Sequence, residues 1–203
     1  MSTAVGAARA AGSIASDIAS RGYSVCRQFL DRPGLRALRA ECLRLHAAGG
    51  FRPAGVGKAG QRMAAERADE IAWLGPERSG PALAAAIRQF EALRVALNRE
   101  LYLGLWEFEC HFAHYPPGAF YRRHRDRLQL DFRRALSCVI YLNDSWVLED
   151  GGVLRIYLDA SDRSIDVEPF GGTLVCFLSE QFEHEVLPVA RSRWSMTGWF
   201  RTR

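Results

Sequence analysis

The chain has 203 residues, of which 48% are hydrophobic and 25% charged, and these proportions are ordinary for a globular protein with a sizeable core. A formal net charge of +4 is too small to mark a nucleic-acid binder, and no apolar run approaches the length that spans a membrane. The first residues also lack the basic segment and apolar stretch of a secretory signal, so we expect a cytoplasmic protein.

The N-terminal part predicts one strand and one helix. The first dozen residues, rich in alanine, glycine and serine, show no hydrophobic periodicity, so we expect them to fray. Residues 23–26, with the sequence YSVC, are expected to form a short strand. Asp31 is suited to cap a helix with Pro33 in its first turn. Apolar residues then recur at steps of three and four as far as the glycine pair at 49–50, which predicts a helix with one apolar face.

The next segment predicts a loop, a strand and a second helix. Residues 51–62 are rich in glycine and basic residues, as is typical of a loop. Ile71 and Trp73 then alternate with more polar neighbours, which indicates a strand. A second amphipathic helix is predicted to begin near Pro81 and to end before Gly104.

From residue 106 onward the sequence changes to short apolar runs separated by turns, which is typical of strands. Two helices followed by about seven strands predict an α+β fold, a sandwich or barrel with the helices covering one sheet. We expect a single domain over residues 1–203, with helical support in residues 1–105 and the barrel core in residues 106–203. The expected strands are WEFECHFAHY, RALSCVIYL, GVLRIYL, SIDVEP, TLVCFL, HEVLPV and RWSMTGWF.

The five cysteines are odd in number and show no CxxC spacing, and most lie inside apolar runs, where a thiol packs as a small hydrophobic group. We therefore expect buried free thiols rather than disulfides or a zinc site. They are Cys26, Cys42, Cys110, Cys138 and Cys176.

A candidate metal site begins with His124 and Asp126, which are two residues apart and would share one face where the backbone is extended. Chance nearly supplies one such pair among 5 histidines and 23 acidic residues, so the spacing alone is weak. His184, which opens a later strand, is the best third ligand. His111 and His114 compete for that role but are more typical of satisfied core or rim histidines. Two histidines and a carboxylate suit non-haem Fe(II), but zinc accepts them too, so these ligands do not separate an oxygenase from a metal hydrolase.

The last predicted strand favours a bound carboxylate. Its alternation places Arg193, Ser195, Thr197 and Trp199 on one face. An arginine on the inward face of a barrel needs a partner, and the distal end of a dicarboxylate would match its parallel donors. The alternative is that this face of the strand is exposed to solvent and that Arg193 is an ordinary surface arginine. Tyr141 lies in a strand whose two faces are both largely apolar, so its hydroxyl is expected to bond either that carboxylate or the backbone.

Arginines also gather around the first metal motif, in the run YRRHRDR over residues 121–127. They form either a positive rim that steers an acidic substrate or a solvated charged loop. A steering role predicts that substrate affinity weakens with added salt.

Taken together, four segments resemble the prolyl hydroxylase group of Fe(II)- and 2-oxoglutarate-dependent dioxygenases, and in particular bacterial relatives of the oxygen-sensing protein prolyl hydroxylases. The resemblance covers residues 107–201 almost continuously and includes an arginine nine residues after the distal histidine. A weaker match upstream is ERADEIAWL, similar to the family's Arg-x-Asp-x-Ile-x-Trp strand, which follows a loop that closes over substrate. The four segments are YPPGAFYRRHRD, RRALSCVIYLNDSW, EDGGVLRIY and HEVLPVARSRWSMTGWF.

The resemblance implies a double-stranded β-helix, or jelly-roll barrel, that binds Fe(II), 2-oxoglutarate and O2, with ascorbate as a possible reductant. It implies that His124, Asp126 and His184 hold the metal. Arg193 and Tyr141 would bind the distal carboxylate of 2-oxoglutarate. Further implied contacts are Tyr115 near the metal-bound end of 2-oxoglutarate, and Arg134, Trp199, Arg67 and Asp69 on the substrate side.

The implied reaction is that of a procollagen-proline or peptidyl-proline 4-dioxygenase, which hydroxylates proline in a protein and releases succinate and CO2. The segment between Tyr115 and His124 is one residue shorter than in the animal oxygen-sensing members, so this chain departs from their pattern next to Tyr115. Nucleic-acid demethylases of the wider superfamily carry a second arginine where this chain has Trp199, so nucleic acid is not expected as a substrate. The alternatives are a hydroxylase of a free amino acid or other small molecule, and a metal-binding barrel that is not an oxygenase.

Overall fold

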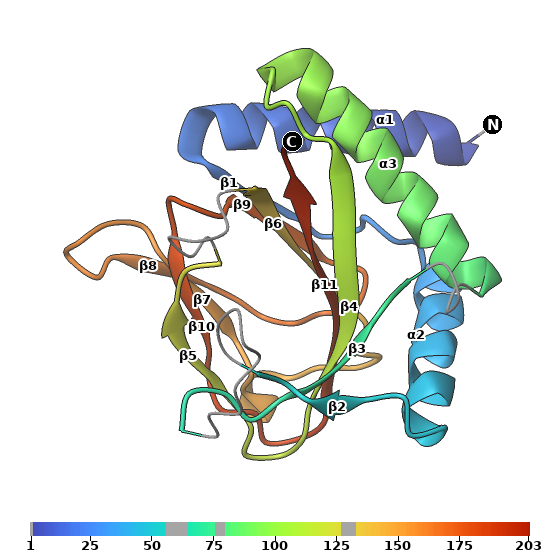
Figure 1. Ribbon diagram of the computed structural model, residues 1–203, viewed down its shortest axis with the longest axis vertical. Helices are drawn as coiled ribbons and strands as arrows, with labels where there is room; N and C mark the ends of the chain where they lie inside the picture. Colours follow the sequence, from blue (N-terminus) through green and yellow to red (C-terminus); the bar gives the residue numbers. More distant parts are fainter. Residues whose placement is uncertain (1, 56–64, 76–79, 127–132) are drawn as a thin grey trace.

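The computed structural model describes residues 2–55, 65–75, 80–126 and 133–203. Figure 1 shows helices lying over one face of a large antiparallel sheet, and a smaller sheet facing the other side. The predicted α+β arrangement of helices and facing sheets is therefore confirmed. Within the described ranges, no helix is both long enough and apolar enough to cross a membrane.

Three helices cover the large sheet: α1 (Ser2–Arg21), α2 (Arg32–Ala47) and α3 (Pro81–Leu101). The start of α2 is as predicted, since the Asp31 side chain accepts a hydrogen bond of 2.8 Å from the amide of Gly34. Glu41 of α2 accepts hydrogen bonds from the first amides of α3, at 2.8 and 3.0 Å, and so joins the two helices.

Residues 2–12 belong to α1, although no helix was predicted there. Alanine-rich sequence has high helix propensity, and the second half of α1 buries Ile14, Ala15 and Ile18 in the core. The apolar periodicity starts only near Ala11, so the first turns of α1 carry no such pattern.

The two sheets contain all seven of the predicted C-terminal strands, and each described strand pairing is antiparallel. The large sheet has the order β1 (Tyr23–Cys26), β9 (Leu174–Leu178), β6 (Arg134–Tyr141), β11 (Arg193–Arg201), β4 (Glu107–Tyr115), β3 (Glu70–Trp73) and β2 (Arg52–Pro53). The small sheet has the order β5 (Tyr121–His124), β10 (Glu183–Val186), β7 (Leu154–Tyr157) and β8 (Ser164–Val167). A short 3-10 helix, η2 (Leu148–Asp150), precedes β7.

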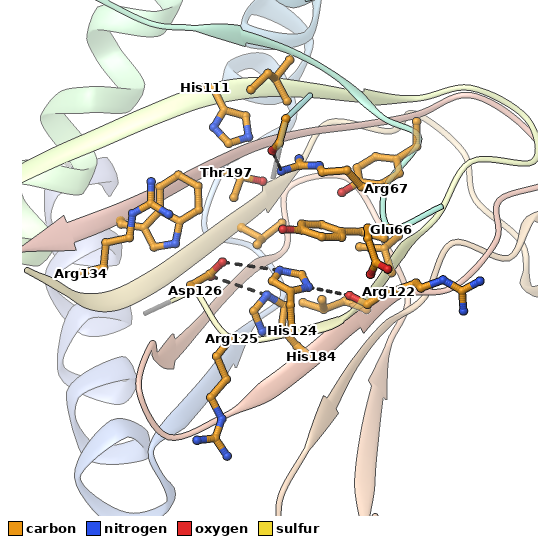
Figure 2. Close-up of a pocket in the computed structure, with 18 of the residues that line it drawn as sticks. Glu66, Arg67, His111, Arg122, His124, Arg125, Asp126, Arg134, His184 and Thr197 are labelled. Atoms are coloured by element: carbon orange, nitrogen blue, oxygen red, sulfur yellow. Dashed lines mark hydrogen bonds and ion pairs between the residues drawn. The ribbon is translucent and has the colours of Figure 1, made fainter. Parts of the chain in front are cut away.

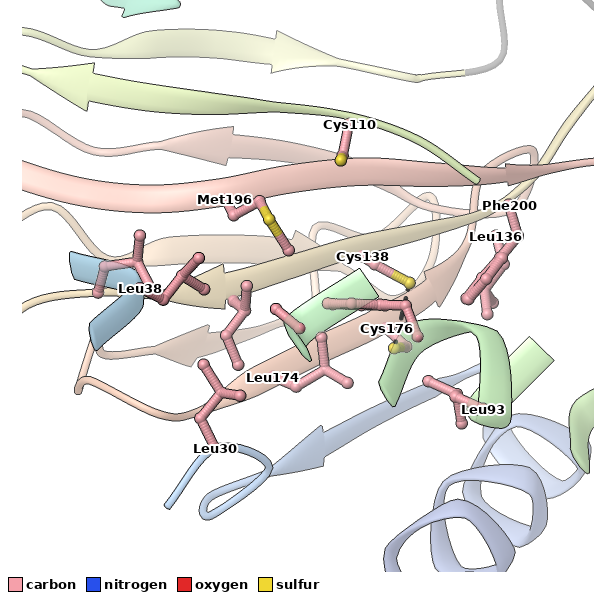
Figure 3. Packing of buried hydrophobic residues seen from close by; sticks show 14 of the residues in the cluster. Leu30, Leu38, Leu93, Cys110, Leu136, Cys138, Leu174, Cys176, Met196 and Phe200 are labelled. Carbon is pink, nitrogen blue, oxygen red and sulfur yellow. Dashed lines mark hydrogen bonds between the residues drawn. The ribbon is translucent and has the colours of Figure 1, made fainter. Parts of the chain in front are cut away.

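Two hydrophobic cores hold the layers together. One lies between the helices and the large sheet, and Figure 3 shows part of it, with Cys138 and Cys176 beside leucine and phenylalanine side chains. The sulfur atoms of these two free cysteines are 3.4 Å apart. The other core lies between the two sheets and includes Tyr115 and Tyr141.

Candidate active site

A cavity of about 430 Å³ opens between the two sheets. Figure 2 shows that charged and aromatic side chains from both sheets point into it. The large sheet contributes residues of β3, β4, β6 and β11, and the small sheet contributes residues of β5, β7 and β10. The two predicted halves of the site, the histidine–aspartate group and Arg193, line this same cavity.

The predicted metal ligands come together at the small sheet. His124 ends β5 and lies directly opposite His184 of the antiparallel strand β10, while Asp126 follows two residues after His124. The Nε2 atoms of both histidines lie 3.6 Å from oxygens of the Asp126 carboxylate. One ligand atom from each of the three residues lies within 4.8 Å of the others, so these residues fit a single metal ion. His111 and His114 lie outside this group.

Hydrogen bonds to neighbouring groups orient these ligands. The Nδ1 atom of His124 lies 2.7 Å from the carbonyl oxygen of Arg122, which requires Nδ1 to donate and leaves the lone pair on Nε2 facing Asp126. The Ser137 hydroxyl donates a hydrogen bond of 2.6 Å to Asp126 and lies 2.8 Å from the Ser179 hydroxyl. Ser137 thus fixes the carboxylate from the large sheet, a contact that the sequence did not reveal.

The protonation states also suit metal binding. Burial alone would raise the pKa of Asp126, but His184, His124 and the Ser137 hydroxyl together hold that pKa well below its usual range. Burial lowers the pKa of His184 to about 4, and the neighbouring His124 acts in the same direction. Near pH 7 the site therefore presents an ionised carboxylate beside a neutral imidazole of His184, the forms that bind a cation.

Arg193 lies at the other side of the cavity and is only 1% exposed. The register of β4 and β11 places it opposite Tyr115, and its guanidinium carbon lies 5.0 Å from the ring centres of both Tyr115 and Tyr141. Gly152 makes room for it, because a Cβ atom there would lie 2.9 Å from Cδ of Arg193. The glycine pair of EDGGVLRIY thus has a direct steric role.

Several polar atoms around Arg193 are buried without a hydrogen-bond partner of acceptable geometry among the described residues. They are Nε of Arg193, the Tyr141 hydroxyl and the Ser195 hydroxyl. Burial raises the pKa of Tyr141 to about 12, although the guanidinium of Arg193 opposes this rise, so the phenol keeps its proton and can donate. A bound carboxylate would accept hydrogen bonds from donors of this kind. A buried donor without a hydrogen bond costs free energy.

Three of the four predicted substrate residues, Arg67, Arg134 and Trp199, line the cavity. Arg67 bonds both oxygens of Asp69 at 2.7 and 2.6 Å, and its guanidinium lies over the Tyr121 ring. Asp69 is buried and outside the cavity lining, so its contact is to Arg67. Arg134 lies over the Trp199 ring at 3.6 Å, and both of these residues line the cavity.

Burial also raises the pKa of Tyr115, the other predicted cofactor-binding residue, well above its ordinary value. Its ring is 5% exposed and lines the cavity beside Arg193. The phenol therefore stays protonated near neutral pH.

The expectation that His111 is a satisfied histidine is wrong. It lines the cavity between Trp73 and Trp199, and its buried Nδ1 atom has no partner in the described part of the chain. Burial lowers the pKa of His111 to about 3. His111 and Tyr115 are four residues apart on β4 and so lie on the same face of the strand. This spacing was the signal that could have placed His111 in the cavity. His114 has the opposite orientation, packs on Trp194 and is buried, which also lowers its pKa.

The basic rim is partly neutralised. Arg123 pairs with Asp162 at 2.6 Å and with Glu183 at 2.7 Å, and Nε of Arg125 lies 3.8 Å from Glu183. Arg122 and Arg125 also line the cavity. Steering of an acidic substrate by this rim stays a prediction. Most of the predicted loop, residues 56–64, and Arg127 of the basic run lie outside the described residues.

Known proteins share both the sequence pattern and the fold. Residues 110–201 match the 2OG-Fe(II) oxygenase superfamily. Human prolyl hydroxylase EGLN3 is 31% identical over 164 residues, which cover 77% of this chain and 68% of the human protein. The mouse protein of the same name is 33% identical over 140 residues, which cover 66% of this chain and 58% of the mouse protein.

Solved structures extend the similarity over nearly all of the chain. A crystal structure of a Pseudomonas putida prolyl-4-hydroxylase has 46% sequence identity and a TM-score of 0.86, and the alignment covers 95% of this chain and 99% of that one. A Trichoplax adhaerens prolyl hydroxylase, solved with a hypoxia inducible factor peptide fragment, shares the fold with a TM-score of 0.90 at 24% identity, over 98% of this chain and 91% of that one. The predicted double-stranded β-helix is thereby confirmed. The chain belongs to the 2OG-Fe(II) oxygenase superfamily and, within it, to the prolyl hydroxylases.

Proposed function

We propose that the chain hydroxylates a prolyl residue within a protein, with His124, Asp126 and His184 holding Fe(II) and with Arg193 and Tyr141 holding 2-oxoglutarate. The observation that carries the proposal is the cavity itself, which joins a three-ligand metal group to a buried arginine that has no ion pair among the described residues. A metal hydrolase would need the metal ligands, but its reaction does not require the buried Arg193.

His124, Asp126 and His184 would supply three ligands to the metal ion, two imidazoles and one carboxylate. This donor set would leave room for the co-substrate and O2. When bound, Fe(II), 2-oxoglutarate and O2 supply the oxidation that yields succinate, CO2 and a hydroxylated substrate. Ser137 and the carbonyl of Arg122 keep Asp126 and His124 in their ligating orientation while these molecules exchange.

Arg193 and the tyrosines beside it determine which keto acid binds. A guanidinium in a closed site pairs with a carboxylate through parallel charge-assisted hydrogen bonds, and the Tyr141 hydroxyl adds a neutral donor. The buried ring of Tyr115 covers Arg193 from the other side and keeps water away from it. A keto acid without a distal carboxylate would leave all of these donors unsatisfied.

The opening suits a peptide segment. Trp199, Trp73 and His111 form an aromatic wall, against which an apolar pyrrolidine ring can pack. Arg67 and Arg134 are each held by a carboxylate, Asp69 and Glu109 respectively, so both are fixed in place for contacts with backbone carbonyls. The 46% identity to the Pseudomonas putida prolyl-4-hydroxylase supports the choice of proline over other residues.

Four finer points belong to the same proposal. The five cysteines are free, and four of them are buried, which fits a reducing compartment and supports a cytoplasmic location. Ascorbate is proposed as the reductant that keeps the iron active, and we propose that nucleic acid is not a substrate. Residues 56–64, which the sequence predicts to belong to a loop, are proposed to contact the protein substrate.

Mass spectrometry of proteins after reaction tests the proposal. Purified chain with Fe(II), 2-oxoglutarate and ascorbate is incubated with cell lysate, and peptides are searched for proline that has gained one oxygen atom. We expect modified proline together with succinate, and neither product with the His184→Ala variant. Hydroxylated free amino acids beside unmodified proteins would favour the small-molecule alternative. Absence of succinate with every candidate substrate would favour a barrel that is not an oxygenase.

A further inference from the structure

A second group of histidines and a carboxylate lies on the opposite side of the large sheet from the cavity. It consists of His46 in the last turn of α2, Glu70 at the start of β3 and His114 near the end of β4. One ligand atom from each residue lies within 4.8 Å of the others, the same condition that the active-site group meets. None of the three residues lines the active-site cavity.

The fold itself brings these residues together. Glu70 and His114 are direct neighbours across the antiparallel pair β3–β4, and Trp194 of β11 is the next residue in the same row. The His114 ring stacks on Trp194 at 3.9 Å, and His46 meets both rings edge-on, at 4.7 Å from His114 and 5.0 Å from Trp194. The aromatic packing therefore fixes both imidazoles with nitrogens directed at Glu70.

The distances fit shared ligation better than a direct hydrogen bond. Nδ1 of His114 and Nε2 of His46 lie 3.3 and 3.4 Å from the same oxygen of Glu70. An N–H···O hydrogen bond is typically about 2.9 Å long. Ligands about 2.0–2.1 Å from a tetrahedral zinc ion are about 3.4 Å from one another, which is the separation found for both contacts.

His114 also has the second contact that is typical of a metal-ligating histidine. Its Nε2 atom lies 3.1 Å from the Ser192 hydroxyl. If Nε2 carries the proton and donates it to Ser192, Nδ1 presents its lone pair toward Glu70. The side chain of His114 is 9% exposed, whereas those of Glu70 and His46 are 40% and 36% exposed. An ion can thus enter from solvent and keep a water molecule as a further ligand.

We propose that His46, Glu70 and His114 bind a divalent transition-metal ion, zinc in particular, at a structural site separate from the active site. Two imidazole nitrogens and one carboxylate oxygen form a donor set that zinc accepts, with water completing the tetrahedron. The ion ties the C-terminal end of α2 to β3 and β4. Because β3 begins directly after Asp69, which holds Arg67 at the cavity opening, the site also anchors that edge of the substrate entrance.

Zinc stoichiometry of the full chain separates the two metal groups. Metal-stripped protein is titrated with Zn²⁺ by calorimetry, and bound zinc is counted by elemental analysis after desalting. We expect about two equivalents for the wild type, about one for His124→Ala/His184→Ala, about one for Glu70→Gln, and none when the three substitutions are combined. In the His124→Ala/His184→Ala chain, Zn²⁺ is also expected to raise the thermal midpoint, and Glu70→Gln to abolish that rise.

Glu149→Gln in the His124→Ala/His184→Ala background is the matched control, because Glu149 is an exposed glutamate of η2. It is expected to keep both the remaining zinc equivalent and the thermal shift. The proposal is overturned if the His124→Ala/His184→Ala chain binds no zinc, or if Glu70→Gln leaves its stoichiometry unchanged. His46→Asn gives a second check, since it alters a half-exposed residue and is expected to lose the same equivalent without unfolding the chain.

Discussion

The two faces of the large sheet use the same strands but hold different side chains. On the helix side, Phe112, Met196 and Phe200 pack into one hydrophobic core with the three helices. On the cavity side, the same strands present Arg193 and Tyr141, whose polar atoms are buried without partners of acceptable geometry in the described residues. Strand alternation thus places residues that are adjacent in sequence in opposite surroundings.

The difference indicates a division of roles within a single sheet. The helix side contributes stability through buried apolar area, whereas the cavity side holds polar groups in place for a molecule that the chain does not itself supply. Substitutions on the helix side should therefore change stability and leave ligand affinity unchanged. Substitutions on the cavity side should change ligand affinity and have a much smaller effect on stability.

His184→Ala should give the largest effect. Removing one of three proposed ligands should reduce the rate of succinate formation by on the order of 1000-fold, because the metal and everything bound to it lose their position. The measurement is succinate release at saturating Fe(II) and 2-oxoglutarate, with the urea midpoint as a control for folding. A folded variant that keeps more than about a tenth of the rate would contradict the proposed metal group.

Phe200→Ala should act mainly on stability. Phe200 is fully buried and packs against Phe108, with ring centres 4.7 Å apart, so its truncation should lower the free energy of unfolding by about 3–5 kcal/mol. Urea unfolding measures the loss, and the KM for 2-oxoglutarate, measured at low temperature, should stay within about twofold of the wild type. A KM for 2-oxoglutarate that rises by much more than twofold would mean that the two faces are not independent.

His111→Gln should change the pH dependence of stability. With a folded pKa of about 3, His111 stays neutral in the native state, while in the unfolded chain it gains a proton below about pH 6.5. The unfolded state therefore binds more protons between these pH values, and the wild type should lose about 1.6 kcal/mol from this residue as the pH falls from 6.5 to 5. Urea unfolding at both pH values should show a smaller loss for His111→Gln. Equal losses would place His111 in a solvated environment.

Tyr141→Phe should produce two small effects of opposite sign. Loss of the hydroxyl should raise the KM for 2-oxoglutarate by about five- to tenfold, which corresponds to about 1 kcal/mol, the net value of one ordinary hydrogen bond. Without 2-oxoglutarate the variant should be more stable by about 1 kcal/mol, since a buried unpaired hydroxyl has been removed. A variant that is less stable in the absence of 2-oxoglutarate would indicate that the hydroxyl is satisfied within the chain.

The sequence predicted the elements that have a local signal. Helix α2 has a cap and an apolar stripe, and the seven C-terminal strands have alternation and turns. Helix α1 was missed because its apolar pattern begins only halfway along, and β5 was missed because Tyr121–His124 is largely basic. Local pattern therefore decided which elements could be foreseen.

Within the site, too, the residues with a local sequence signal could be predicted, whereas contacts that depend on the tertiary structure could not. His124 and Asp126 are adjacent enough to form a motif, and family resemblance linked them to His184 and Arg193. The bond from Ser137 to Asp126 depends on how two sheets face each other, which no spacing encodes. The contact between Glu70 and His114 joins residues 44 positions apart through the register of one strand pair, so it too required the structure.

The affinities for two keto acids that differ in the distal carboxylate test the assignment of Arg193 to the co-substrate. Anaerobic calorimetry with Fe(II)-loaded protein compares 2-oxoglutarate with 2-oxopentanoate, which has the same carbon chain but no distal carboxylate, in the wild type and in Arg193→Leu. We expect the wild type to prefer 2-oxoglutarate by about 100-fold, or about 2.7 kcal/mol, and Arg193→Leu to lose nearly all of that preference. An equal preference in both proteins would contradict the assignment of Arg193 to the co-substrate.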